Sequence, residues 1–106
     1  MQFVLLGYDG KDDDALGRRL AARERHLALG DRLAAEGTLL FATAILDADD
    51  KMIGSMLVLD FPSRAELDAW LEIEPYVTGD VWRKAEILPA KVSPSFIRTG
   101  TQARRT

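Results

Sequence analysis

The chain contains no cysteine, a single histidine and no long apolar run. The absence of cysteine excludes disulfide bonds, thiolate catalysis and cysteine-ligated metal sites, and one histidine alone disfavours a zinc or transition-metal site. No apolar stretch is long enough to cross a bilayer, and the opening segment MQFVLLGYDG has neither the basic start nor the cleavage site of a signal peptide. We therefore predict no metal site, no membrane partner and a cytoplasmic location.

Basic residues are too few for a typical nucleic-acid-binding domain. The 14 Lys and Arg residues stand against 17 Asp and Glu residues, which gives a net charge of −3. One basic cluster, formed by Arg98, Arg104 and Arg105, lies among Thr, Gly and Gln, and we expect it to be solvated and frayed. We predict no nucleic-acid partner.

The chain is long enough for one hydrophobic core and too short for two. Of its 106 residues, 47% are hydrophobic and 29% are charged, as is ordinary for a globular domain. No linker or internal repeat divides it. We predict one domain over residues 1–93, followed by a C-terminal tail over residues 94–106.

Six segments carry the pattern of a strand or a helix. Compact apolar runs bounded by turn residues predict strands, and apolar residues at helical spacing predict helices. In chain order the predicted elements are strand 2–8, helix 15–36, strand 38–46, strand 52–61, helix 62–73 and strand 84–92. The stretch EPYVTGDVW predicts a short connecting turn or helix. Pro89 cannot donate to a strand ladder, so we expect the last strand at an edge of the sheet or at a bulge.

Capping residues indicate where the two long helices begin and end. The acidic run at residues 12–14 offers N-caps for the first helix, and Gly37 is a natural terminator. Ser63 and Glu66 have the spacing of a capping box for the second helix. The apolar stripe predicted for the first helix consists of Leu16, Leu20, Leu27 and Leu33.

The β-α-β-β-α-β order predicts an α+β, ferredoxin-like fold, in which two helices cover one face of a four-stranded antiparallel sheet. The other face would carry alternate residues of FATAIL and SMLVLDF, an apolar patch that a monomer leaves uncovered. A second copy packed sheet to sheet would cover it, so we predict a homodimer.

His26 and Glu74 are the residues most suited to chemistry. An unperturbed histidine changes charge near neutral pH, and His26 lies at the border of the apolar stripe, where it is either a surface residue or a base facing a cleft. Glu74 precedes Pro75, so it either marks a simple helix stop or fixes an acid at the mouth of a cleft. The acidic clusters at residues 12–14 and 47–50 lack the spacing of a calcium loop and fit capping and turn chemistry.

The N-terminal strand and the stretches RERHLALGDRLAAEGTLLFAT and GSMLVLDFPSRAELDAWLEIEPYV resemble the YciI-like, or YCII-related, family in order and spacing. Members show Arg-x-x-His-Leu in the first helix, an acidic residue and Gly at its end and then Leu. Gly-Ser opens their third strand, and Ala-Trp in the next helix precedes Asp-Pro-Tyr or Asp-Pro-Phe. The resemblance runs from Met1 to about Val92. The matching positions are Arg23, His26, Leu27, Glu36, Gly37, Leu40, Gly54, Ser55, Ala69, Trp70, Glu74, Pro75 and Tyr76.

The resemblance implies a dimeric α+β barrel, in which two ferredoxin-like subunits press their sheets together. It also implies a His-Asp dyad in a cleft and no bound cofactor. Here the dyad would be His26 and Glu74, whose carboxylate arm is one methylene longer than that of the usual Asp. The best-described activity among similar proteins is dechlorination of a chlorinated hydroxyquinol, and related barrels include lactone isomerases and cofactor-free monooxygenases.

Two functions from different classes stay open. The first is a small cofactor-free enzyme with His26 as general base and Glu74 orienting the imidazole, for proton abstraction with elimination or isomerisation of a small cyclic or aromatic metabolite. Its substrate-binding residues would be Arg23, Ser55 and Tyr76. The second is a non-catalytic, dimeric small-molecule-binding or regulatory module. A paired His26 and Glu74 at the base of an enclosed pocket would favour the enzyme. If the two side chains point into open solvent, the module is favoured.

Overall fold

A computed structural model describes residues 1–96 and confirms the predicted ferredoxin-like α+β fold. Its elements are β1 (Gln2–Asp9), α1 (Ala15–Ala35), β2 (Leu39–Leu46), β3 (Met52–Asp60), α2 (Arg64–Leu71), the short α3 (Pro75–Thr78), β4 (Trp82–Ala90) and the 3-10 turn η1 (Pro94–Phe96). Residues 94–96 of the predicted tail form η1. Residues 97–106, with the basic cluster, lie outside the described part.

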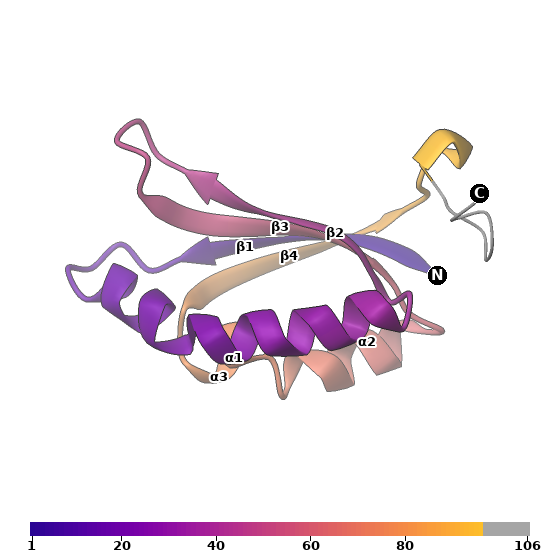
Figure 1. The fold of residues 1–106 in the computed structure, drawn as a ribbon, viewed down its shortest axis with the longest axis horizontal. Helices are drawn as coiled ribbons and strands as arrows, with labels where there is room; N and C mark the ends of the chain where they lie inside the picture. The colour runs from indigo at the N-terminus through magenta and orange to yellow at the C-terminus, as the bar shows by residue number, and fades with distance from the viewer. Residues whose placement is uncertain (97–106) are drawn as a thin grey trace.

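The strands form one antiparallel sheet in the order β2-β3-β1-β4. All the α-helices of the described chain lie on the same side of this sheet (Figure 1). Pro89 lies in β4, an edge strand, as predicted, where a missing backbone donor is best tolerated. The central strands β1 and β3 therefore form the floor on which the helices pack.

The hydrophobic core lies between this floor and the helices. Side chains alternate along a strand, so Phe3 and Leu5 of β1 face the helices beside Leu59 and Leu57 of β3. The other buried members of the cluster are Ala22, Phe61, Leu67, Trp70, Tyr76, Val81 and Trp82. Tyr76, Val81 and Trp82 come from the segment after α2, so α3 and the start of β4 contribute to the core.

Local sequence signals account for most helix ends. Ser63 caps α2 as predicted, its hydroxyl accepting from the Glu66 N–H at 3.2 Å. Gly37 follows α1 with φ +81°, a conformation that glycine adopts without steric cost. The acidic run before α1 departs from the prediction, because Asp14 occupies the N-cap position without a side-chain hydrogen bond. Asp12 binds the Arg18 side chain instead.

The leucine stripe predicted for α1 is for the most part exposed. Its exposed members are Leu16, Leu20 and Leu27, at 37%, 54% and 44%. The buried face of α1 consists of Ala15, Arg19 and Ala22. The helix thus turns small and charged side chains toward the sheet, whereas Leu29 and Leu33 pack at the margin of the core. No helix within residues 1–96 has both the length and the apolar character needed to cross a membrane.

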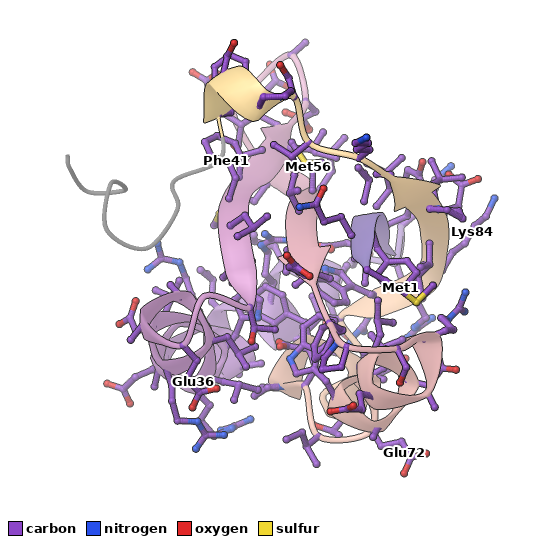
Figure 2. All side chains as sticks on the ribbon, turned by 90° about the vertical axis from the view of Figure 1, so that its right-hand side faces the viewer. Met1, Glu36, Phe41, Met56, Glu72 and Lys84 are labelled. Atoms are coloured by element: carbon purple, nitrogen blue, oxygen red, sulfur yellow. The ribbon has the colours of Figure 1, made fainter. Side chains whose placement is uncertain are left out.

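The outer face of the sheet, opposite the helices, is largely apolar. By strand register its apolar side chains are Val4, Leu6, Tyr8, Phe41, Ile45, Met56, Val58 and Leu88. Phe41 is 58% exposed and Leu88 is 50% exposed. Figure 2 shows Phe41 and Met56 on the side of the sheet away from the helices. An exposed patch of this kind usually marks a contact surface.

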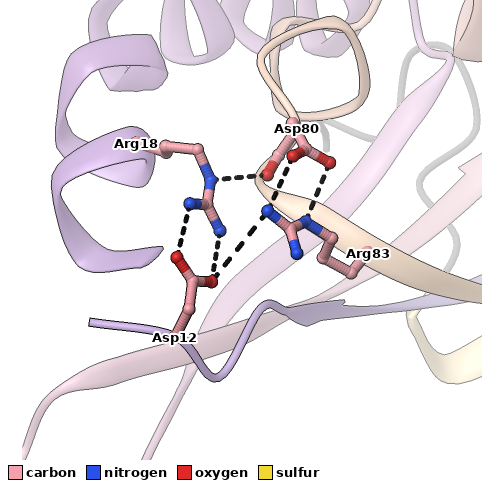
Figure 3. A network of polar contacts seen from close by, with 4 residues as sticks. All are labelled: Asp12, Arg18, Asp80 and Arg83. Carbon is pink, nitrogen blue, oxygen red and sulfur yellow. Dashed lines mark hydrogen bonds and ion pairs between the residues drawn. The ribbon is translucent and has the colours of Figure 1, made fainter. Parts of the chain in front are cut away.

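An ion-pair network fastens the loop before α1 to the start of β4 (Figure 3). Arg18 donates to both carboxylate oxygens of Asp12 at 2.8 Å and to the Asp80 carbonyl at 2.9 Å. Arg83 pairs with the Asp80 carboxylate at 2.8 Å and lies 4.0 Å from Asp12. The Arg18 guanidinium holds the pKa of the Asp12 carboxyl well below its ordinary value.

We predict that Asp12→Asn lowers the melting temperature at pH 7 and low salt. A carboxyl whose pKa is lowered by folding stabilises the folded state above its ordinary value, about 4, and loses that contribution as the pH falls. The difference from wild type should therefore shrink steadily below pH 4. Asp13→Asn is the matched control, because it removes the same charge one residue away. A pH-independent difference for Asp12→Asn would contradict the ion-pair explanation.

Candidate functional site

His26 and Glu74 form a hydrogen-bonded pair that joins α1 to α3. The His26 Nδ1 atom bonds the Glu74 Oε1 atom. Glu74 is also the N-cap of α3, because the same Oε1 accepts from the Tyr76 N–H at 3.2 Å. Glu74 is 1% exposed, and the His26 side chain is 14% exposed. One buried carboxylate oxygen therefore caps α3 and fixes the imidazole ring.

This pairing determines which imidazole nitrogen is free. An ionised carboxylate only accepts hydrogen bonds, so His26 Nδ1 carries a proton. In the neutral ring Nε2 is then the unprotonated nitrogen. Within residues 1–96 no side chain bonds Nε2, so its lone pair has no partner in the described chain.

Two aromatic rings pack against the imidazole. Tyr76 stacks on His26 with ring centroids 3.7 Å apart and planes 8° from parallel. Trp82 meets both rings edge-on, with centroids 5.8 Å from His26 and 5.5 Å from Tyr76. Stacked and edge-to-face contacts are favourable aromatic geometries. Packing and a hydrogen bond together hold the His26 ring in one orientation.

A buried ion pair joins Arg19 of α1 to Asp9 of β1. Arg19 Nη1 donates to both carboxylate oxygens of Asp9 at 3.0 Å, and Arg19 Nη2 donates to Ser55 Oγ at 2.9 Å. Trp82 Nε1 donates to the same Oγ at 3.2 Å. The Arg19 guanidinium carbon lies 4.8 Å from the centre of the Tyr76 ring. Side chains from α1 and β4 thus converge on the hydroxyl of a serine in β3, and Asp9 of β1 holds the arginine.

The stacked His26 and Tyr76 rings and the bonded Arg19 and Ser55 side chains border one cleft. It has a volume of about 170 Å³ and lies between α1 and the β2–β3 part of the sheet. Four of the predicted residues line it, namely Arg23, His26, Ser55 and Tyr76. Glu74 lies behind His26 and is buried, so of its two sequence-based interpretations the one that places it at the mouth of a cleft is wrong. The N-cap role explains this, because the carboxylate turns inward to reach the first N–H groups of α3.

Sequence reasoning missed Asp9, Arg19 and Trp82. A signal was present for Arg19, because Arg19, Arg23 and His26 have i, i+4, i+7 spacing and share one helix face. A second signal was Gly7 inside a strand, which indicates a close approach by another group. A Cβ atom on Gly7 would lie 2.6 Å from carbons of the Trp82 indole. Trp82 therefore reaches Ser55 only because residue 7 has no side chain.

The charges around the cleft are unevenly paired. Burial raises the pKa of Asp9, and the Arg19 guanidinium opposes that change. Burial also raises the pKa of the Tyr76 phenol, which is therefore neutral at physiological pH. Arg19 is neutralised by Asp9, whereas Arg23 makes no ion pair within the described chain.

Among residues 1–96 no group of three or more His, Asp or Glu side chains is placed to hold a metal ion.

Comparison with known proteins matches residues 1–91 to the YCII-related domain family. The chain belongs to the YCII-related family. Protein YciI of Escherichia coli is 32% identical over 97 residues, which span 86% of this chain and 97% of YciI. An uncharacterized protein of Haemophilus influenzae is 31% identical over 97 residues, with the same coverage. The predicted family is confirmed.

Solved structures share the fold of this YCII-related chain. The 5-chloro-2-hydroxyhydroquinone dehydrochlorinase of Burkholderia phenoliruptrix, in complex with 2,5-dihydroxybenzoquinone, matches with a TM-score of 0.77 at 22% identity, over 90% of this chain and 98% of that one. An antibiotic biosynthesis monooxygenase matches with a TM-score of 0.51 at 13% identity, over 88% of this chain and 98% of that one. The likeness at these identities concerns the fold.

We predict that Glu74→Ala lowers the free energy of unfolding by about 2 kcal/mol, because it removes a helix cap and leaves the buried His26 Nδ1–H without an acceptor. Glu74→Gln keeps an oxygen at the same place and should cost much less. Urea denaturation of the three proteins measures both values. Equal losses for the two variants would contradict the role given to the Glu74 oxygen.

Proposed function

We propose that this YCII-related protein is a small cofactor-free enzyme that abstracts a proton from a small cyclic or aromatic metabolite, with elimination or isomerisation. The observation that carries the proposal is the His26–Glu74 pair at the wall of a cleft. His26 takes the proton through Nε2. Glu74 orients the ring and stabilises the imidazolium that forms, as a carboxylate does for other histidine bases.

The burial of the pair favours an enzyme over a binding module. A ligand-binding surface has no need of a carboxylate that is 1% exposed behind a histidine. Burying a carboxylate is costly unless it is hydrogen-bonded. Here the buried carboxylate accepts a hydrogen bond from one imidazole nitrogen of His26. The other nitrogen is left for a substrate.

The size and lining of the cleft suit a single small ring. Its volume of about 170 Å³ is close to the roughly 150 Å³ of an apolar cavity that holds benzene in another protein. Leu27, Ala42 and Leu57 line it with apolar surface, and Arg23 adds a positive charge without a partner in the described chain. A ring that carries a phenolate or enolate oxygen fits both properties. The dehydrochlorinase of similar fold, which binds a dihydroxybenzoquinone, makes hydroxylated rings the first class to test.

We predict that His26→Asn lowers kcat about 100-fold or more, because general-base catalysis contributes at least that factor. KM should change little, since Asn keeps a donor near Glu74. The assay is turnover of a panel of chlorinated hydroxyquinols, small phenols and lactones, followed by chloride release or absorbance. Arg25→Ala, which changes an exposed neighbour on α1, is the control. Full activity in His26→Asn would refute the role of His26 as general base. Binding without turnover in wild type would support the non-catalytic binding module instead.

The proposal includes a homodimer formed by the outer face of the sheet. Phe41, Met56, Val58 and Leu88 are wholly or partly exposed there in a single chain. A second copy packed sheet to sheet would remove this apolar surface from water. Dimerisation would also brace β2, the edge strand beside the cleft.

We predict that the wild-type protein sediments at twice its monomer mass of 11.8 kDa at micromolar concentration. Phe41→Glu should shift it to monomer, because it places a charge within the proposed apolar interface. Ile73→Glu is the matched control, since Ile73 is 59% exposed and Phe41 58%, but Ile73 lies outside the sheet. A monomeric wild-type protein, or equal effects of both variants, would refute this interface.

A further inference from the structure

The Ser55 hydroxyl on the cleft wall has both of its acceptor positions filled. Arg19 Nη2 and Trp82 Nε1 donate to Ser55 Oγ at 2.9 and 3.2 Å. Guanidinium and indole N–H groups can only donate, so the serine oxygen accepts in both bonds. A serine hydroxyl has two acceptor lone pairs and one proton, which leaves the third direction to its own O–H. Within residues 1–96 no group accepts that proton.

Arg19 itself is not free to bind a ligand. Its Nη1 atom is held by both carboxylate oxygens of Asp9, and its Nη2 atom is directed at Ser55. Its Nε atom is buried without a partner in the described chain, and the whole residue is 3% exposed. The hydrogen bonds of the guanidinium are thus committed within the protein, and in the described chain the cleft-lining side chain that accepts from it is Ser55.

Trp82 is fixed just as firmly. Its indole ring lies against Gly7, where a Cβ atom would come within 2.6 Å of it, and it is 6% exposed. Gly7 is the strand partner of Ser55, so the ring is seated on the strand beside the serine. Neither donor to Ser55 Oγ can turn away without opening the core.

We infer that Ser55 is an oriented hydrogen-bond donor to a substrate oxygen, and that Arg19 and Trp82 are positioning residues that fix the direction of its proton. The inference rests on the proposed function. Two donors to the same oxygen polarise the hydroxyl and make its proton a stronger donor. Such a donor stabilises negative charge that develops on a carbonyl or ring oxygen as His26 removes a proton. The substrate class is accordingly a ring whose acceptor oxygen is conjugated to the site of proton loss.

The test uses 2,5-dihydroxybenzoquinone as the probe, because the carbonyl oxygens on its ring accept hydrogen bonds. Affinity is measured by calorimetry. Ser55→Ala should weaken binding about five- to tenfold, the value of one hydrogen bond. Trp82→Phe should weaken it about twofold or more by releasing the hydroxyl to rotate. In the Ser55→Ala background Trp82→Phe should cost nothing further, because the tryptophan acts through the serine. Trp70→Phe is the matched control, since the buried Trp70 Nε1 has no partner in the described chain.

A ligand-free measurement accompanies the titrations. In Ser55→Ala the indole N–H signal of Trp82 should move upfield in the NMR spectrum, while that of Trp70 stays in place. An unmoved Trp82 signal would overturn the inference. Equal affinity of wild type and Ser55→Ala, or additive losses in the double variant, would also overturn it and leave the proposed function standing. Failure of wild type to bind the probe would count against the proposed substrate class itself, and against this inference with it.

Discussion

The site depends on how one buried carboxylate is satisfied. Glu74 is 1% exposed, and a carboxylate so placed costs several kcal/mol unless hydrogen bonds compensate it. Its Oε1 atom receives the Tyr76 N–H from α3 and the His26 Nδ1–H from α1. Because the donors come from two helices, satisfying the charge clamps those helices together. Pro75 fits this scheme, since the first position of a helix requires no N–H.

The polar inner side of α1 accounts for the cleft between this helix and the β2–β3 part of the sheet. A helix that turned leucines toward β2 would close the space against Ala42 and Ala44. Here α1 presents Arg19, Arg23 and His26 on that side. Arg19 is hydrogen-bonded to Ser55 of the sheet, and His26 is hydrogen-bonded to Glu74 at the start of α3. The cleft beside β2 thus exists because α1 turns polar side chains, and not leucines, toward this strand.

The order of strands and helices along the chain, the α2 cap and the edge position of Pro89 could be predicted because their signals are local and strong. The pairing of His26 with Glu74 needed the family resemblance, since 48 residues separate them and neither is distinctive alone. Arg19 and Asp9 were missed for another physical reason. A charged residue inside an amphipathic helix looks solvated until its partner is known, and that partner sits across the sheet–helix boundary. The burial of α1 was misjudged in the same way, because leucines normally outcompete arginine for a core face.

Trp82 links the two halves of the site. Its ring edge contacts the His26 imidazole, and its Nε1 atom donates to Ser55, so one rigid side chain touches the candidate base and the candidate oxygen-binding donor. A ring with only two rotatable bonds, seated on Gly7, cannot change one contact without disturbing the other. The separation between the proton acceptor and the hydroxyl donor is therefore set by the core and not by flexible side chains. Such preorganisation lets weak individual hydrogen bonds act together on a single small ring.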